Sequence, residues 1–200
     1  MTTYALNGLG RIGKLALRPL LERGAQIAFI NDAIGDPAMH AHLLEFDSVH
    51  GRWPAEFSAD ADAISIDGTR IPVTSTRTLE DLPLDGVDVV IDCTGAFKTE
   101  ASLAPYFAAG VKKVIVSAPV KDGPTANIVY GVNEGIYDPA THQIITAASC
   151  TTNCLAPVVK VLLEGIGIKH GSITTIHDVT NTQTIIDRPA KDLRRARSAL

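Results

Sequence analysis

Cys150 lies between Ser149 and Thr151, directly before a long apolar run, and this setting suits a nucleophilic thiolate. The apolar residues from 155 to 163 have the spacing of a helix, with Pro157 expected in its first turn. Cys150 would then lie at the helix N-terminus, where unpaired N–H groups and the helix dipole stabilise a thiolate. The alternative is a buried thiol that only packs, which is our interpretation of Cys93 and Cys154.

His177 is the candidate partner for this thiolate. It ends the β-branched run 172–177, which predicts a strand that presents the imidazole at its tip. An imidazole beside a cysteine holds the thiolate as an ion pair and then acts as a general base. The alternative is a solvated histidine at the end of a strand.

A glycine-rich turn near the N-terminus predicts a phosphate site. Residues 3–6 read as a strand that runs into Gly8, Gly10 and Gly13 in the spacing G-x-G-x-x-G, and a helical pattern follows. The first glycine permits the turn, the second lets a pyrophosphate approach the backbone, and the third allows close packing of helix and strand. The alternative is a glycine turn that binds nothing.

Asp32 follows a second predicted strand, residues 26–30. It lies about twenty residues beyond the glycines, where dinucleotide-binding proteins place a ribose-binding carboxylate. A carboxylate accepts hydrogen bonds from the ribose hydroxyls and repels a 2′-phosphate. The sequence therefore predicts NAD rather than NADP.

The elements that must position these residues alternate between strand and helix. Residues 87–92 and 113–117 read as buried strands, and residues 102–109 read as the helix between them. This alternation predicts a doubly wound parallel sheet with ligands at the carboxyl ends of its strands. Residues 63–73 carry an Asp-Gly turn that predicts a β-hairpin.

Composition favours a globular α/β enzyme, with 46% hydrophobic and 20% charged residues among 200. A net charge of −4 gives no reason to expect nucleic acid or an anionic membrane as partner. Three cysteines without a disulfide framework, and an N-terminus without an apolar signal, predict a cytoplasmic protein with no membrane insertion. We expect no metal, because His40 and His42 do not face one point on a helix.

The motifs at 7–13, 149–157 and 174–197 resemble those of the phosphorylating glyceraldehyde-3-phosphate dehydrogenases, and the resemblance runs over essentially the whole chain. It implies a Rossmann-type NAD-binding domain over residues 1–149, followed by the truncated start of an α+β catalytic domain over residues 150–200. The implied activity is NAD-dependent oxidation of glyceraldehyde 3-phosphate through a cysteine thioester, with phosphate or arsenate as acyl acceptor. The implied assembly is a homotetramer.

The resemblance also implies roles for single residues. Cys150 would attack the aldehyde, and His177 would assist hydride departure and acylation. The positions that match the substrate phosphate or the attacking anion are Ser149, Thr151, Thr180 and Arg195. The positions that match cofactor contacts are Gly8, Gly10, Arg11, Ile12, Gly13, Asp32, Arg77, Ser117 and Asn181. Arg188 stands where the NAD-dependent enzymes usually have leucine, and we expect Asp32 to keep the preference for NAD.

Residues 40–53 and 176–184 most resemble the branch associated with arsenic resistance, which is thought to use arsenate in place of phosphate. The nearest rival activity is that of an erythrose-4-phosphate dehydrogenase. The chain ends before further anion-binding residues of the family's catalytic domain, so we expect a fragment of a longer enzyme. The alternative of a different class is an inactive, stand-alone NAD-binding module.

Overall fold

The computed structural model describes residues 1–180 and 183–199 of the chain. They form two compact units, Met1–Val161 and Leu162–Leu200. In chain order the elements are β1 (Thr3–Asn7), α1 (Arg11–Glu22), β2 (Gln26–Asn31), α2 (Pro37–Glu45), β3 (Phe46–Asp47), β4 (Gly51–Arg52), β5 (Phe57–Ala59), β6 (Ala63–Ile66), β7 (Thr69–Thr74), η1 (Leu79–Asp81), β8 (Val89–Asp92), α3 (Glu100–Ala108), β9 (Lys113–Val116), β10 (Thr125–Asn127), η2 (Glu134–Ile136), β11 (Ile144–Thr146), α4 (Cys150–Gly165) and η3 (Leu193–Arg195).

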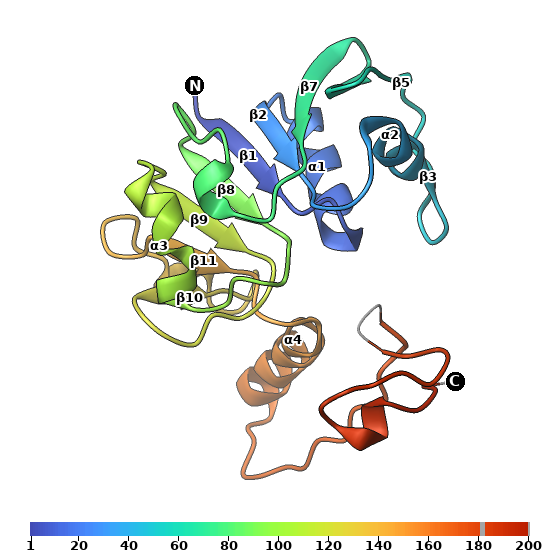
Figure 1. Ribbon diagram of the computed structural model, residues 1–200. Helices are drawn as coiled ribbons and strands as arrows, with labels where there is room; N and C mark the ends of the chain where they lie inside the picture. The colour runs from blue at the N-terminus through green and yellow to red at the C-terminus, as the bar shows by residue number, and fades with distance from the viewer. Residues whose placement is uncertain (181–182, 200) are drawn as a thin grey trace. The chain divides into compact units, whose positions relative to one another are not determined.

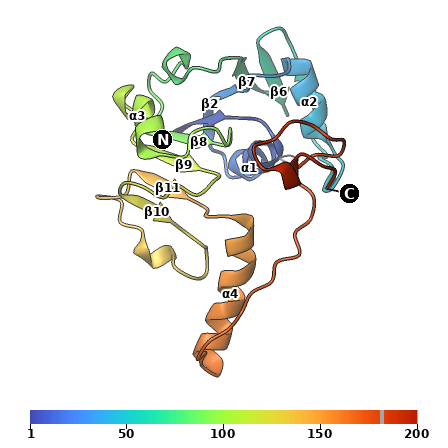
Figure 2. The same cartoon turned by 60° about the horizontal axis from the view of Figure 1, so that its bottom comes forward.

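A nine-stranded sheet forms the centre of the first unit, in the order β10-β11-β9-β8-β1-β2-β7-β6-β5 (Figure 1). The strands from β10 to β7 pair in parallel, and Figure 2 gives a second view of β10, β11 and β9 side by side. From β7 to β11 the strand order is that of a doubly wound dinucleotide-binding sheet, so the topological switch point, where the order of strand addition reverses, lies between β1 and β8. The predicted α/β fold with a doubly wound parallel sheet is confirmed.

Two hydrophobic clusters cover the two faces of this sheet. Successive residues of a strand point to opposite faces, so Ala5 joins one cluster and Leu6 the other. The first cluster contains Leu103 and Tyr106 of α3, and the second contains Leu17 of α1. Each fully buried Leu or Val contributes about 1.5–3 kcal/mol, which fixes the helices on the sheet and the loops that join them.

The predicted Asp-Gly hairpin is present. Asp67 has φ 48° and Gly68 has φ 78°, the left-handed pair that a two-residue turn between twisted strands requires. The sequence did not indicate that β7 also pairs in parallel with β2 and so extends the main sheet.

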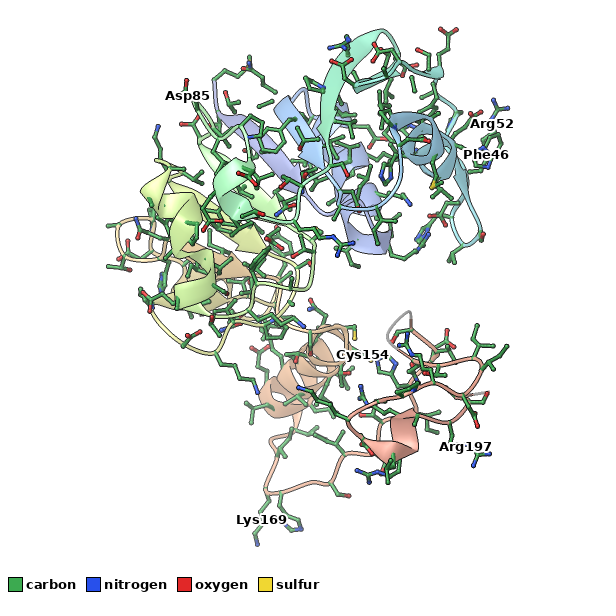
Figure 3. The ribbon with its side chains drawn as sticks, in the orientation of Figure 1. Phe46, Arg52, Asp85, Cys154, Lys169 and Arg197 are labelled. Atoms are coloured by element: carbon green, nitrogen blue, oxygen red, sulfur yellow. The ribbon has the colours of Figure 1, made fainter. Side chains whose placement is uncertain are left out.

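A second, short hairpin follows α2. β3 pairs with β4, and the Arg52 guanidinium lies 5.5 Å from the ring centroid of Phe46. Figure 3 labels both side chains. Asp47, on the same hairpin, forms an ion pair with Arg11 at the start of α1. The hairpin is thereby anchored to the helix that follows the glycine-rich turn.

Two expectations about the last fifty residues were wrong. Pro157 lies in the second turn of α4 rather than the first, and its ring nitrogen cannot donate to the carbonyl of Asn153. Residues 172–177 have no regular structure, because the β-branched run has no partner strand among the described residues. The helices described for this chain are all too short or too polar to cross a membrane.

Candidate functional site

The three glycines of the turn between β1 and α1 have different surroundings. Gly8 has φ 93°, and a Cβ there would lie 2.6 Å from the backbone nitrogen of Thr94. A Cβ on Gly13 would lie 2.0 Å from the carbonyl oxygen of Gly8, so only glycine lets α1 approach the turn. A Cβ on Gly10 would meet nothing within 4 Å among the described residues. The backbone at Gly10 is therefore open to a ligand.

The N-terminus of α1 suits an anion. Gly10 is the N-cap residue and has no side chain to accept from the first N–H groups, and the first turn contains no acidic residue. The Arg11 guanidinium pairs with Asp47, holding the pKa of that carboxyl well below its usual range. What α1 offers a phosphate is therefore its backbone N–H groups and dipole.

Asp32 follows β2 and faces the same region. Its Oδ2 accepts from the backbone N–H of Leu9 at 2.7 Å, and its Oδ1 accepts from that of Ile34 at 3.0 Å. The carboxylate is thus tied to the glycine-rich turn, and each oxygen keeps a lone pair for a further donor such as a ribose hydroxyl.

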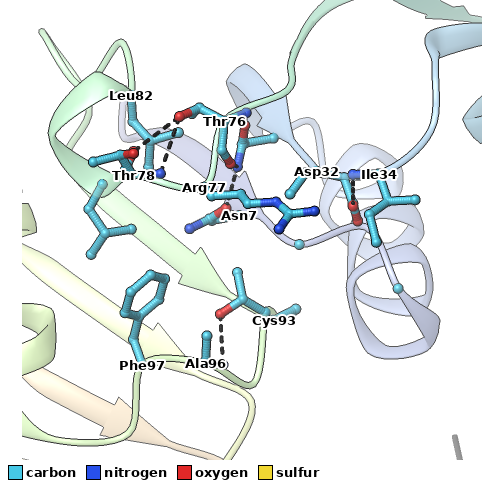
Figure 4. Close-up of a pocket in the computed structure, with 16 residues that line it drawn as sticks. Asn7, Asp32, Ile34, Thr76, Arg77, Thr78, Leu82, Cys93, Ala96 and Phe97 are labelled. Atoms are coloured by element: carbon cyan, nitrogen blue, oxygen red, sulfur yellow. Dashed lines mark hydrogen bonds between the residues drawn. The ribbon is translucent and has the colours of Figure 1, made fainter.

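A cavity of about 480 Å³ lies at the carboxyl ends of β1, β2 and β8, at the topological switch point of the sheet (Figure 4). Its lining residues are Asn7, Gly8, Gly10, Asn31, Asp32, Ala33, Ile34, Thr76, Arg77, Thr78, Leu79, Leu82, Cys93, Thr94, Ala96 and Phe97. Apolar walls with a carboxylate and an uncapped helix start fit the adenosine and pyrophosphate of a dinucleotide.

Other predicted cofactor residues have varied positions. Arg77 is exposed and lines the cavity, and its side chain projects towards Asp32 in Figure 4. Ile12 is 55% exposed on α1, and Ser117 follows β9, with its N–H donating to the carbonyl of Asp92. The predicted contact at Asn181 lies outside the described residues.

Cys93 lines the cavity, although the sequence did not predict it as a site residue. Burial raises the pKa of its thiol to about 11, against an opposing hydrogen bond with Ser117. Its thiol is therefore protonated at neutral pH. The surroundings agree with the interpretation of Cys93 as a packing residue.

Cys150 is the first residue of α4 and is exposed to solvent. Ser149 caps the helix, because its Oγ accepts from the N–H of Thr152 at 3.1 Å. Ala148, the residue before this cap, has φ 56°, a left-handed conformation that side chains rarely adopt. The chain is thus bent sharply where it delivers the thiol to the helix N-terminus. Cys154 is also exposed, so its interpretation as a packing residue was wrong.

Thr151 is the second residue of α4 and is half-buried, whereas His177, Thr180 and Arg195 lie in the second unit. His177 is exposed, and its Nδ1 lies 2.7 Å from the carbonyl oxygen of Asp178. The N–H of Thr180 donates to Oε1 of Gln183 at 2.7 Å. Because Cys150 and His177 belong to different units, their pairing stays a prediction.

Arg195 lines a small cavity of about 100 Å³ in the second unit. The other lining residues are Gln183, Thr184, Arg194, Arg197 and Ala199. Arg194 pairs with Asp192. Arg197 likewise pairs with Asp187, so an oxyanion ligand in this hollow would bind chiefly to Arg195.

The sequence interpretation missed the loop residues Thr76, Thr94 and Phe97, which line the first cavity. The available signal was position, because Thr94 follows a buried strand of a parallel sheet, where ligands bind. Within the described ranges, no three His, Cys, Asp or Glu residues come together as a metal site.

Two family models match the chain. Residues 2–100 match the model for the glyceraldehyde 3-phosphate dehydrogenase NAD-binding domain. Residues 149–200 match the model for the glyceraldehyde 3-phosphate dehydrogenase C-terminal domain. The two matches belong to the same family and follow one another in the order of the chain.

Curated relatives give the same result. The chain is 55% identical over 196 residues to glyceraldehyde-3-phosphate dehydrogenase 3 of Nostoc sp., covering 96% of this chain and 58% of the relative. It is 51% identical over 198 residues to glyceraldehyde-3-phosphate dehydrogenase of Streptomyces coelicolor, covering 97% and 58%. It is 48% identical over 201 residues to the plasmid-encoded glyceraldehyde-3-phosphate dehydrogenase of Cupriavidus necator, covering 98% and 59%. The chain thus spans less than two thirds of the length of these relatives.

Proposed function

Since the chain belongs to the glyceraldehyde-3-phosphate dehydrogenase family, we propose that its protein oxidises glyceraldehyde 3-phosphate through a thioester on Cys150. The cofactor of its N-terminal domain is NAD. When bound, NAD supplies the acceptor for a hydride. The observation that carries the proposal is the exposed position of Cys150 at the first residue of the capped helix α4.

The residues divide the reaction between them. The Cys150 thiolate adds to the aldehyde carbon while the His177 imidazolium protonates the carbonyl oxygen, and the resulting hemithioacetal loses a hydride and the hydroxyl proton to become a thioester. His177 takes that proton, and its imidazolium favours the thiolate at the start of each cycle. The oxygen of a tetrahedral oxyanion then attacks the thioester carbon and expels the Cys150 thiolate, which leaves an acyl phosphate or its arsenate analogue.

Anion binding falls to the hydroxyl and guanidinium groups, Ser149, Thr151, Thr180 and Arg195. Hydroxyls donate without adding charge, and a guanidinium offers two parallel donors to one anion.

The dinucleotide pocket holds the cofactor. The pyrophosphate lies against Gly10 and the start of α1, and the ribose lies against Asp32. Further contacts come from Arg11, Ile12, Arg77, Ser117 and Asn181.

The finer assignments are parts of the same proposal. The NAD-binding domain covers residues 1–149 and the catalytic portion begins at residue 150. The acceptor is phosphate or arsenate, and arsenate enters the proposal through the likeness of residues 40–53 and 176–184 to the arsenic-resistance branch. The working assembly is a cytoplasmic homotetramer.

NADH formation from glyceraldehyde 3-phosphate in the intact protein, with phosphate or arsenate, tests the proposal. Cys150→Ser should lower kcat by at least about a thousandfold, because the hydroxyl is a far weaker nucleophile. His177→Asn should lower it by about a hundredfold or more. Cys154→Ser, one turn along the same helix, is the control and should keep kcat within about twofold.

Three outcomes would contradict the proposal or part of it. A folded protein that binds NAD and forms no NADH would instead be an NAD-binding module. Faster turnover of erythrose 4-phosphate would favour the rival dehydrogenase. Equal activity of Cys150→Ser and Cys154→Ser would exclude Cys150 as the nucleophile.

A further inference from the structure

Four buried side chains at the dinucleotide pocket, of which Asn7 and Asn31 line it, form one continuous series of hydrogen bonds. Asn31 Nδ2 donates to Asn7 Oδ1 at 2.7 Å, and Asn7 Nδ2 donates to Tyr106 Oη at 2.6 Å. Tyr106 Oη then donates to Asp92 Oδ2 at 2.8 Å. The four residues are at most 3% exposed, so water cannot replace a lost partner.

Both ends of this series are held by further groups. Asn31 Oδ1 accepts from Thr74 Oγ1 and from the N–H of Thr76, each at 2.9 Å. At the other end, Asp92 Oδ1 accepts from the N–H of Thr94 at 3.0 Å and from its hydroxyl at 2.7 Å.

The group at one end of this series of hydrogen bonds determines which partner donates in each of them. The N–H of Thr76 can only donate, so Asn31 must present its oxygen there and its amide nitrogen to Asn7. Asn7 then turns its own nitrogen to Tyr106, whose single proton goes on to Asp92. Each donor polarises the next, and the set behaves as a unit rather than as separate bonds.

Each strand-end member of this series directly precedes a residue of the pocket. Asn7 precedes Gly8, Asn31 precedes Asp32, and Asp92 precedes Cys93. The backbone ladder ends with the N–H groups of Gly8 and Cys93, which donate to the carbonyls of Asn31 and Asn7 at 2.7 and 2.6 Å. Side-chain hydrogen bonds across β1, β2 and β8 add a second constraint just where this ladder ends, and Tyr106 joins them from α3.

We propose that Tyr106, acting through Asn7 and Asp92, is a positioning residue for NAD binding. Tyr106 is not among the residues that line the pocket, and it acts by setting the distance between the glycine-rich turn and the loop that follows β8. The inference rests on the NAD site described above. A network with one partner missing leaves buried donors unpaired and lets these loops drift apart.

Isothermal titration of NAD, with denaturant unfolding of the same samples, tests this role. Tyr106→Phe removes one oxygen and should raise the NAD Kd about tenfold, since Asn7 Nδ2 and Asp92 Oδ2 lose their partner. Leu103→Ala is the matched control, because Leu103 is 0% exposed, on the same helix and in the same core cluster. It should destabilise the protein and leave the Kd within about twofold.

Thr74→Val is a gentler variant for the case in which Tyr106→Phe does not fold. It keeps the shape of the side chain, removes one donor to Asn31 and should raise the Kd about threefold. An unchanged Kd in the folded variants, with a loss of stability like that of Leu103→Ala, would overturn the role. A wild-type protein that binds no NAD would instead defeat the proposed function itself.

Discussion

Cys93, Cys150 and Cys154 carry the same thiol in different surroundings. Cys93 is half-buried, and burial raises its pKa to about 11. Cys150 and Cys154 are exposed on α4, and Cys150 is its first residue. Since the thiolate is the reactive form, solvent access and local field decide which cysteine reacts.

We expect iodoacetamide at pH 8 to modify the cysteines of α4 and to leave Cys93 unmodified in the folded protein. A pKa of about 11 leaves about one Cys93 in a thousand as thiolate at that pH. Mass spectrometry of tryptic peptides measures the extent at each site. In denaturant, Cys93 should react like the others, and equal labelling of Cys93 and Cys154 in the folded state would refute the prediction.

Two glycines in the turn between β1 and α1 serve different purposes. Gly13 is required for packing, because its Cβ would overlap the carbonyl oxygen of Gly8. Gly10 has φ −72°, which any residue adopts, and open space around its Cβ position among the described residues. The fold itself therefore does not require glycine at Gly10, and a ligand that approaches the backbone does.

Gly10→Ala and Gly13→Ala should consequently fail in different ways. Gly10→Ala should change the free energy of unfolding by less than about 0.5 kcal/mol and weaken NAD binding about tenfold or more. Gly13→Ala should cost about 2–4 kcal/mol, because α1 must move away from the turn. Denaturant unfolding and calorimetric NAD titration measure both quantities. A stable Gly13→Ala variant would contradict the packing role, and unchanged NAD affinity in Gly10→Ala would contradict the approach of the pyrophosphate.

His40 affects the stability of the whole first unit. It is 4% exposed, and neither ring nitrogen has a hydrogen-bond partner among the residues that the structure describes. Burial lowers the pKa of His40, and the charge of Lys14 lowers it further, whereas Asp32 and Asp36 raise it. The imidazole is therefore neutral in the folded protein at a pH where the unfolded chain already binds a proton.

The free energy of unfolding should fall as the pH is lowered from about 6.5, the ordinary histidine pKa. Below that pH the unfolded state binds one proton more than the folded state, with a slope of at most about 1.4 kcal/mol per pH unit. His40→Leu should flatten this slope, because it removes the buried base without breaking a hydrogen bond. Urea unfolding between pH 5 and about 7.5 measures it.

His42→Gln is the control for this experiment. His42 is exposed on the same helix, and its replacement should leave the slope as in the wild type. A His40→Leu protein with the wild-type slope would show that another group takes up the proton.

Short-range sequence patterns were enough to predict most of the structure of the first unit. The apolar strands, the G-x-G-x-x-G turn and the Asp-Gly hairpin depend on residues close in the chain, and all three are present. Asp32 was also predictable, because it follows a strand at a fixed distance from the glycines. The run 172–177 was predicted wrongly, since β propensity forms a strand only where a neighbouring strand completes its hydrogen bonds.

The sequence by itself therefore determined the fold class, the glycine turn with the Asp32 carboxylate beside it, and the cysteine at the start of a helix. Each follows from backbone geometry or from periodicity within about twenty residues. Only the tertiary structure decided that β7 extends the sheet beside β2, and that Tyr106 reaches Asn7, 99 positions away in the chain, and Asp92. These contacts join residues far apart in the chain, and their energies depend on burial and on partner geometry, which no local pattern encodes.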